Sequence, residues 1–106
     1  METPKQFSPE TILPIVVECL REVLLQKKLP IPDPIEETRL IGSKSVLDSL
    51  GLVTLVVDIE QRVEQEYGCY VPLTDERAMS QTHSPFRSPL TLADYLSRLL
   101  IESVTL

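Results

Sequence analysis

The stretch LDSLGLVTLVVDIEQRVEQEYG, from Leu47 to Gly68, decides the fold of this chain. Its apolar residues recur at intervals of three and four, and successive residues of a helix are about 100° apart, so they share one side. They are Leu52, Leu55, Val56, Ile59 and Val63. We expect the helix to start at Ser49 and to end at Gly68, because glycine adopts the left-handed conformation that terminates helices. The stretch predicts a long amphipathic helix with one core face.

A second helix is predicted near the N-terminus. Ser8 is a typical N-cap, Pro9 suits the first helical position and Glu10 suits the first turn. Pro14 lacks an N–H group and its ring disturbs a helix, so we expect the regular part to begin only near Leu13 and to reach about Lys28. Its apolar stripe consists of Ile15, Val16, Cys19, Leu20, Val23 and Leu24.

The segments before and after this helix are predicted to be irregular. Residues 1–8 show no periodicity, and we expect them to fray. Residues 29–48 carry three prolines at alternate positions, which predicts a long loop that leads to Ser49. A loop of this length is usually functional. Its apolar residues Ile35, Leu40, Ile41 and Val46 are expected to pack back on the helices.

The C-terminal third predicts two more helices. A short one would run from Thr74 to about Ser80, and the last would start with a capping-box-like pair, Thr91 and Asp94. The connection 79–90 between them contains Phe86, which we expect to turn inward. The last helix repeats apolar residues at helical spacing: Leu92, Tyr95, Leu96, Leu99 and Leu100. The sequence therefore predicts an all-α, small three-to-four-helix bundle in a single domain, residues 1–106.

Composition narrows the classes of partner. The net charge is −6, which argues against nucleic acid and favours a basic protein partner. No apolar run approaches the roughly 20 residues that cross a bilayer, and the first residues do not resemble a signal peptide. We expect a cytoplasmic monomer with no membrane span.

Residues that usually perform catalysis or bind metals are sparse. Cys19 and Cys69 do not stand at a metal-ligand spacing with His83, the single histidine. Adjacent Glu36 and Glu37 are typical of solvated loop charge. The segment GSKS, residues 42–45, lacks the spacing and the strand of a phosphate-binding loop. We therefore expect no enzyme active site and no metal.

Ser49 stands at the predicted start of the central helix. Unpaired N–H groups and the positive end of the helix dipole meet there, and both favour an attached phosphate. Two structural explanations compete with this function. Ser49 could simply be the N-cap, or Asp48 could be the cap with Ser49 as the next residue.

A family resemblance starts at the same residues. The sequence Leu47-Asp48-Ser49-Leu50 and the helix after it resemble the modification site and second helix of acyl carrier proteins, whose core signature is Asp-Ser-Leu. Further matches follow in the order that the family shows, and they cover most of the chain from about Thr11. These are Leu40, Tyr67-Gly68, Val71-Pro72 and the segment TLADYL, residues 91–96.

The resemblance implies a function and a set of partners. A 4′-phosphopantetheine arm would be joined to Ser49 by a phosphodiester, with Asp48 and Leu50 beside it, and acyl groups would ride on its thiol as thioesters. The protein would then be a substrate and shuttle for other enzymes. The implied partners are a phosphopantetheinyl transferase, an acyl-activating ligase or acyltransferase, and downstream synthases with basic docking surfaces, as in fatty acid or polyketide biosynthesis.

The sequence also departs from this family. Acyl carriers usually have acids at the positions of Gly51 and Thr54, so the negative charge here begins only at Asp58. This departure indicates a dedicated system, and Asp-Ser-Leu-Gly is similar to the D-alanyl carrier proteins. An aminoacyl carrier and an unmodified helical interaction domain therefore stay open as alternatives.

A docking surface is predicted beside Ser49. Leu50, Val53 and Val57 lie away from the core face on a helical wheel and would form an apolar strip. Glu60 and Glu64 would add charge that steers basic partners. The alternative is that a wider bundle buries the three apolar residues.

Overall fold

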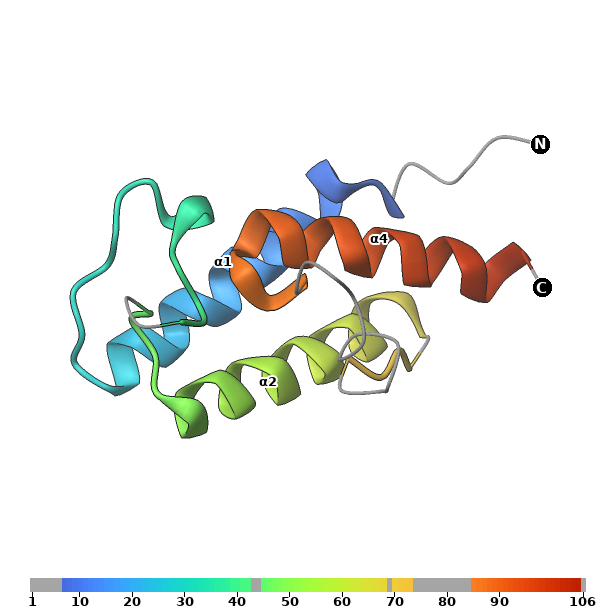
Figure 1. Cartoon of the computed structure of the whole chain (residues 1–106). Coiled ribbons are helices and arrows are strands. Elements are labelled where there is room, and N and C mark those ends of the chain that lie inside the picture. Colours follow the sequence, from blue (N-terminus) through green and yellow to red (C-terminus); the bar gives the residue numbers. More distant parts are fainter. Residues whose placement is uncertain (1–6, 43–44, 69, 74–84, 106) are drawn as a thin grey trace.

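The computed structural model describes residues 7–42, 45–68, 70–73 and 85–105, and these form an all-helical bundle (Figure 1). Its α-helices are α1 (Pro9–Gln26), α2 (Ser49–Tyr67) and α4 (Pro89–Thr105), and its short 3-10 helices are η2 (Ile35–Glu37) and η3 (Pro85–Arg87). The predicted fold class is confirmed for these residues. The expected helix from Thr74 to Ser80 lies outside the described residues, as does most of the 79–90 connection.

Helix α1 is the centre of the arrangement, because it packs against both α2 and α4. The chain leaves α1, passes through the long loop with η2 and returns along α2 (Figure 1). The end of α1 and the start of α2 consequently lie at the same end of the molecule. This arrangement brings Lys27, which follows α1, close to Asp48 and Gly51 at the start of α2.

Helix α1 begins at the predicted cap, Ser8, but its regular part starts earlier than predicted. Ser8 is the N-cap, its side chain accepts a hydrogen bond from the Thr11 N–H at 3.3 Å, and the helix runs continuously from Pro9 through Pro14. The prediction of a regular helix only from Leu13 is therefore wrong. Pro14 removes one hydrogen bond to the carbonyl of Glu10, but both residues are exposed, so water can satisfy that carbonyl.

The end of α1 has an unusual terminating residue. Lys28 takes the left-handed conformation with φ of 58°, and the Leu29 N–H donates to the Leu24 carbonyl at 2.9 Å. This bond from the residue after the left-handed one is the pattern that usually has glycine at the left-handed position. Lysine therefore occupies a backbone position at which its Cβ atom is disfavoured.

Helix α2 has the predicted bounds. Gly68 follows it in the left-handed conformation with φ of 69°, and its N–H donates to the Glu64 carbonyl at 2.8 Å. Four of the five residues of the predicted core face are buried, namely Leu55, Val56, Ile59 and Val63. Leu52 is only partly buried.

Helix α4 starts two residues before the predicted Thr91. The Ser88 side chain accepts from the Thr91 N–H at 3.3 Å, and the Thr91 hydroxyl accepts from the Ser88 N–H at 3.0 Å. This reciprocal pair is a capping box with threonine in place of the usual glutamate, and Pro89 fills the first helical position. The predicted partner Asp94 instead pairs with Arg98 at 3.6 Å.

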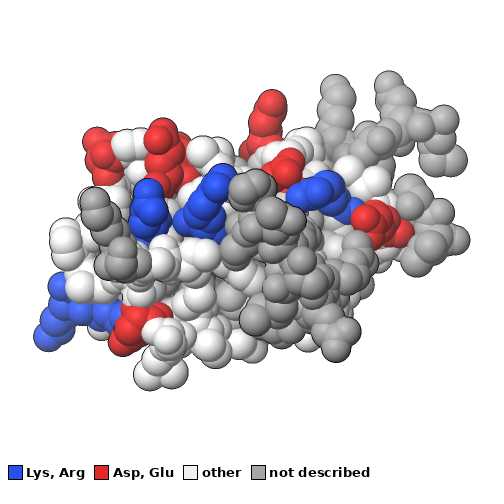
Figure 2. Space-filling view, in the orientation of Figure 1, with Lys and Arg blue, Asp and Glu red and all other residues white. Residues whose placement is uncertain are grey.

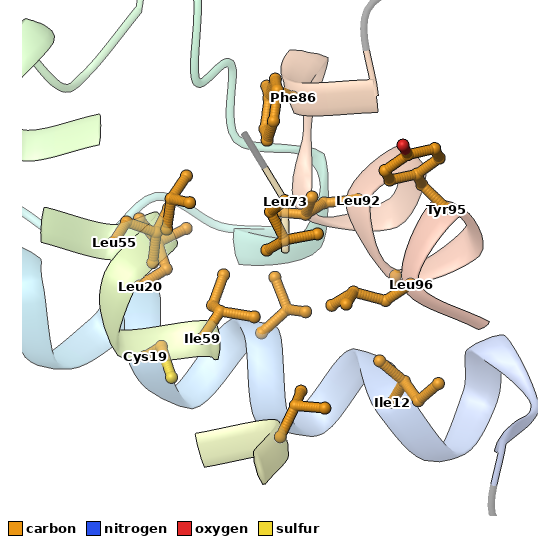
Figure 3. Close-up of a cluster of buried hydrophobic side chains, with 14 of the residues drawn as sticks. Ile12, Cys19, Leu20, Leu55, Ile59, Leu73, Phe86, Leu92, Tyr95 and Leu96 are labelled. Atoms are coloured by element: carbon orange, nitrogen blue, oxygen red, sulfur yellow. The ribbon is translucent and has the colours of Figure 1, made fainter. Parts of the chain in front are cut away.

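The core lies between the three α-helices and closes with residues from the connections (Figure 3). Phe86 turns inward as predicted, and Leu73 is fully buried beside it. The apolar residues of α4 contribute as predicted: Leu92, Tyr95, Leu96, Leu99 and Leu100 are all buried. One continuous core accounts for the packing of the described residues.

The expectation that residues 1–8 fray is wrong for Phe7 and Ser8. Phe7 is buried and its ring contacts the Tyr67 ring edge-on, with centroids 5.4 Å apart. The Ser97 hydroxyl donates to the Phe7 carbonyl. These contacts fix the start of α1 against α2 and α4, which periodicity in a short segment could not show.

The long loop packs back on the helices, with one exception. Leu40 is buried, Ile35 and Ile41 are partly buried, and the Leu40 N–H donates to the Arg87 carbonyl at 3.0 Å. Val46 lies at the surface, contrary to the prediction. Its N–H donates to the Arg39 carbonyl at 3.1 Å, so backbone bonding, not side-chain burial, holds this turn.

Within the part of the chain that the structure describes, no helix is both long and apolar enough to cross a bilayer.

Candidate functional site

Ser49 is the first residue of α2, and Asp48 is its N-cap. Asp48 has extended backbone geometry, and its Oδ1 atom accepts a hydrogen bond from the Gly51 N–H at 2.7 Å. The Asp48 carbonyl accepts the first backbone bond of the helix, from Leu52 at 2.9 Å. Asp48, Ser49 and Leu50 are all exposed. Of the two competing structural explanations, the structure therefore selects Asp48 as the cap.

The Ser49 hydroxyl is accordingly free of a capping role. Among the residues that the structure describes, it makes no hydrogen bond or ion pair. It stands at the positive end of a helix of 19 residues, where an attached anion is stabilised by the dipole and by unpaired N–H groups. The position suits covalent modification by a group that carries a phosphate.

A hollow of about 370 Å³ opens beside Ser49. Its apolar wall comes from the end of the long loop and the first turn of α2, and its polar atoms come from Ser45, Asp48 and Ser49. The lining residues are Leu40, Ile41, Gly42, Ser45, Leu47, Asp48, Ser49 and Leu52. The volume lies at the lower end of the range of small-molecule sites. The exposed Ser49 side chain thus lies next to an apolar surface.

Gly51 is the contact point between α1 and the first turn of α2. A Cβ atom at this position would lie 3.0 Å from Cε of Lys27, 3.1 Å from Oδ1 of Asp48 and 3.3 Å from Cδ2 of Leu47. The Lys27 stem therefore lies directly against the glycine, and its Nζ atom is 3.9 Å from Asp48 Oδ1. Glycine here makes room for a lysine beside the start of α2.

The predicted apolar strip is exposed. The exposed fractions are 69% for Leu50, 58% for Val53 and 42% for Val57. The alternative, that a wider bundle buries them, does not hold for the described residues. Three neighbouring apolar side chains on one face of α2 are consistent with an interaction surface, and their role in docking stays a prediction.

The two predicted steering acids have different surroundings. The Glu60 carboxylate accepts a hydrogen bond from the Leu73 N–H at 2.7 Å and is half-buried, so it holds the connection after α2. Glu64 is exposed in the last turns of α2. Only Glu64 has a carboxylate wholly available to a partner, and its steering role stays a prediction.

Charge is unevenly spread over the face shown in Figure 2. The surface over the first half of α2 is largely white, that is, formed by uncharged residues. At the lower left of the molecule, Lys or Arg atoms (blue) lie next to Asp or Glu atoms (red). At the start of α2, Lys27 forms an ion pair with Asp48. Elsewhere Arg62 pairs with Glu22 at 3.2 Å, across the interface of α1 and α2.

The other candidate residues that the structure describes do not form a second centre of chemistry. Cys19 is buried among apolar side chains, and this burial raises the pKa of its thiol to about 11, which makes it a poor nucleophile. No group of possible metal ligands occurs among the described residues. Glu37 lines a separate open hollow of about 220 Å³ with Arg39, Arg87 and Ser88. His83 and Cys69 lie outside the described residues.

Sequence reasoning missed the contribution of Lys27, which the helix pattern assigns to the polar side of α1. The signal was Gly51 itself. Glycine inside a helix costs about 0.5 to 1 kcal/mol relative to alanine, and close approach by another group is one reason for a glycine near a helix start. Which group approaches could be known only from the packing of α1 against α2.

Comparisons with protein-family models, with curated proteins and with solved structures give no match to this chain.

Proposed function

We propose that this protein is a specialised acyl carrier protein that bears a 4′-phosphopantetheine arm on Ser49. Acyl groups would be held on the thiol of the arm as thioesters and passed between enzymes. The observation that carries the proposal is the Ser49 hydroxyl, which is exposed at the start of α2 and left free because Asp48 caps the helix. It belongs to the Asp-Ser-Leu motif of an all-helical bundle.

The surroundings of Ser49 support this function. The phosphodiester would stand at the positive end of α2, and the hollow beside Ser49 would give the arm an apolar wall. The exposed strip of Leu50, Val53 and Val57 would be the contact surface for enzymes that act on the arm. In this role the protein is no enzyme itself, and it works in the cytoplasm as the substrate of a phosphopantetheinyl transferase, a ligase or acyltransferase, and synthases.

The test is a measurement of mass. The protein is incubated with coenzyme A and a phosphopantetheinyl transferase of broad specificity, and the intact chain is weighed. We expect a gain of one phosphopantetheine, lost in Ser49→Ala. Ser45→Ala is a matched control, because Ser45 lines the same hollow and donates to the Leu47 carbonyl at 2.9 Å, yet should still permit the gain.

No mass gain, or a gain that persists in Ser49→Ala, contradicts the carrier function and leaves an unmodified helical interaction domain. A second candidate, an aminoacyl carrier of the D-alanyl type, is favoured by Gly51 after Asp-Ser-Leu. The two carriers separate when the modified protein is offered to ligases that load amino acids or fatty acids, because only one class of thioester should form.

The contact role of the strip has its own test. Val57→Glu places a charge on a side chain that is 42% exposed, so we expect helical circular dichroism to be unchanged. The rate of loading by the transferase should fall, because the charge would meet an apolar partner surface. Collapse of the helical signal would show that Val57 belongs to the core.

A further inference from the structure

The hollow beside Ser49 lies on one side of that residue, and the exposed apolar strip lies on the other. At about 100° per residue, Leu52 stands about 60° from Ser49 around the axis of α2, and Leu52 lines the hollow. Val53 stands about 40° from Ser49 in the opposite sense, and Leu50 and Val57 lie beyond it. These three residues are not part of the hollow's lining. Ser49 therefore stands at the border between a concave apolar surface and the strip.

The wall of the hollow is held in place by the fold. The Ser45 N–H donates to the Gly42 carbonyl at 3.2 Å, and the Ser45 hydroxyl donates to the Leu47 carbonyl at 2.9 Å. Ile41 and Leu52 pack against the core but are only partly buried, so part of each side chain remains open to the hollow. The apolar wall is therefore formed before any ligand binds.

Ser45 adds a hydrogen-bond acceptor to this wall. Its hydroxyl proton is used in the bond to the Leu47 carbonyl, but a hydroxyl oxygen keeps lone pairs that accept from a ligand. Asp48 also lines the hollow. Its Oδ1 atom already accepts from the Gly51 N–H at 2.7 Å and lies 3.9 Å from Nζ of Lys27, which lessens its repulsion of an attached phosphate.

The part of the proposed arm nearest to Ser49 has chemistry that matches this wall. In 4′-phosphopantetheine the phosphate is followed by one methylene group, then by a carbon with two methyl groups, and then by a hydroxyl and an amide. The short connection keeps the two methyl groups close to Ser49, where they meet the hollow, the strip or water. The concave hollow surrounds them on more sides than the convex strip, so it removes more apolar surface from water.

We infer that the hollow holds the two methyl groups of the arm and that Ser45 Oγ accepts a hydrogen bond from the hydroxyl beside them. The inference rests on the proposed function for the presence of the arm, and it adds where on this chain the arm lies when no partner is docked. Tethering gives an effective concentration in the millimolar range, so a dissociation constant of about 1 mM already half-fills the hollow. The strip stays uncovered for docking.

Free pantetheine tests the hollow without modification of Ser49. Reduced pantetheine is titrated to about 20 mM, well above the dissociation constant of about 1 mM expected. The unmodified protein carries 13C-labelled methyl groups of Ile, Leu and Val, whose chemical shifts are followed. We expect saturable shifts for Ile41 and Leu52 and smaller shifts for Val53 and Val57. Shifts confined to the strip, or no shifts at the highest concentration, overturn the inference.

Substitutions in the wall sharpen this test. Ile41→Ala and Leu52→Ala should each weaken pantetheine binding roughly fourfold, the effect of losing about one methylene-sized apolar contact. Ser45→Ala should also weaken binding, and Ser45→Thr, which keeps the oxygen, should not. Val53→Ala is the matched control, because it changes the same helix on the other side of Ser49. Circular dichroism checks that each variant keeps its helices. Equal affinity in all variants contradicts the assignment of the wall.

The modified protein gives a second readout. Nuclear Overhauser contacts from the methyl protons of the arm should reach Ile41 and Leu52, and contacts only with Val53 and Val57 would place the arm on the strip instead. The mass gain on Ser49 is measured separately. A gain without contacts to the hollow refutes this inference alone. Binding of free pantetheine to the hollow without a gain contradicts the carrier function and leaves the hollow as a site for the free compound.

Discussion

The side chain of Lys27 lies across Gly51, so that a Cβ atom at position 51 would be 3.0 Å from Lys27 Cε. This contact joins the last residues of α1 to the first turn of α2 and leaves the ammonium group 3.9 Å from the helix cap Asp48. A larger residue at position 51 would displace Lys27. Glycine at position 51 therefore has a local structural consequence.

A double-mutant cycle tests this contact. In the wild-type background the helix preference for alanine and the crowding by Lys27 oppose each other, so Gly51→Ala should change stability little. A Lys27→Ala background removes the contact with Lys27 and keeps those with Asp48 Oδ1 and Leu47 Cδ2 at 3.1 and 3.3 Å. Gly51→Ala should therefore be more favourable there than in wild type, by up to about 0.5 to 1 kcal/mol. Urea unfolding measures both values. Equal effects in the two backgrounds would show that the contact has no energetic weight.

The roles of Asp48 and Ser49 can be separated by stability. Asp48→Ala should lower the free energy of unfolding by about 1 kcal/mol, because the Gly51 N–H loses its acceptor at 2.7 Å. Asp48→Asn keeps a capping oxygen and should cost much less. Ser49→Ala should leave stability nearly unchanged, as measured by urea unfolding. If Ser49→Ala destabilises as much as Asp48→Ala, Ser49 shares the capping role.

Lys28 offers a stabilising substitution. Its φ of 58° is unfavourable for a residue with a Cβ atom, so Lys28→Gly should raise the free energy of unfolding by about 1 kcal/mol. Lys27→Gly is the control, because Lys27 has φ of −88° and gains nothing from glycine. The measurement is the stability of both variants relative to wild type, from thermal unfolding. A loss of stability in Lys28→Gly would mean that its side chain makes a compensating contact.

Glu60 should matter for stability more than its place in α2 suggests. Glu60→Ala removes the acceptor of the Leu73 N–H, and a hydrogen bond to a charged group contributes about 1.5 to 3 kcal/mol. We expect a loss near the lower value because Glu60 is only half-buried. Faster hydrogen exchange of the Leu73 amide should accompany it. Glu64→Ala, on the same helix, should leave both quantities unchanged.

Cys19 predicts a dependence of stability on alkaline pH. Burial raises the pKa of its thiol from 9.0 to about 11 in the folded protein. Between these values the unfolded chain loses the proton and the folded chain keeps it, so the free energy of unfolding should fall as pH rises, by up to about 2.7 kcal/mol. The measurement is the difference between wild type and Cys19→Ala at each pH. A difference that does not vary with pH would contradict the prediction.

Local patterns predicted the helices well because each depends on residues close in sequence. The apolar spacing after Ser49 and the glycine at position 68 fix α2, and Ser8 with Pro9 fixes the start of α1. The patterns failed where contacts with other residues determine the structure of a segment. Phe7 is held by Tyr67 and Ser97, and α4 starts at Pro89 because Ser88 and Thr91 cap each other.

The sequence by itself determined the all-helical class, the core face of α2 and the Asp-Ser-Leu motif at its start, because helical periodicity and capping are local properties. Only the tertiary structure decided which residues at the start of α2 are exposed to solvent and which charged side chains lie beside them. Packing of α1 against α2 places Lys27 over Gly51, and the fold ties Glu60 to Leu73. These contacts join residues far apart in the chain, so no local pattern could reveal them.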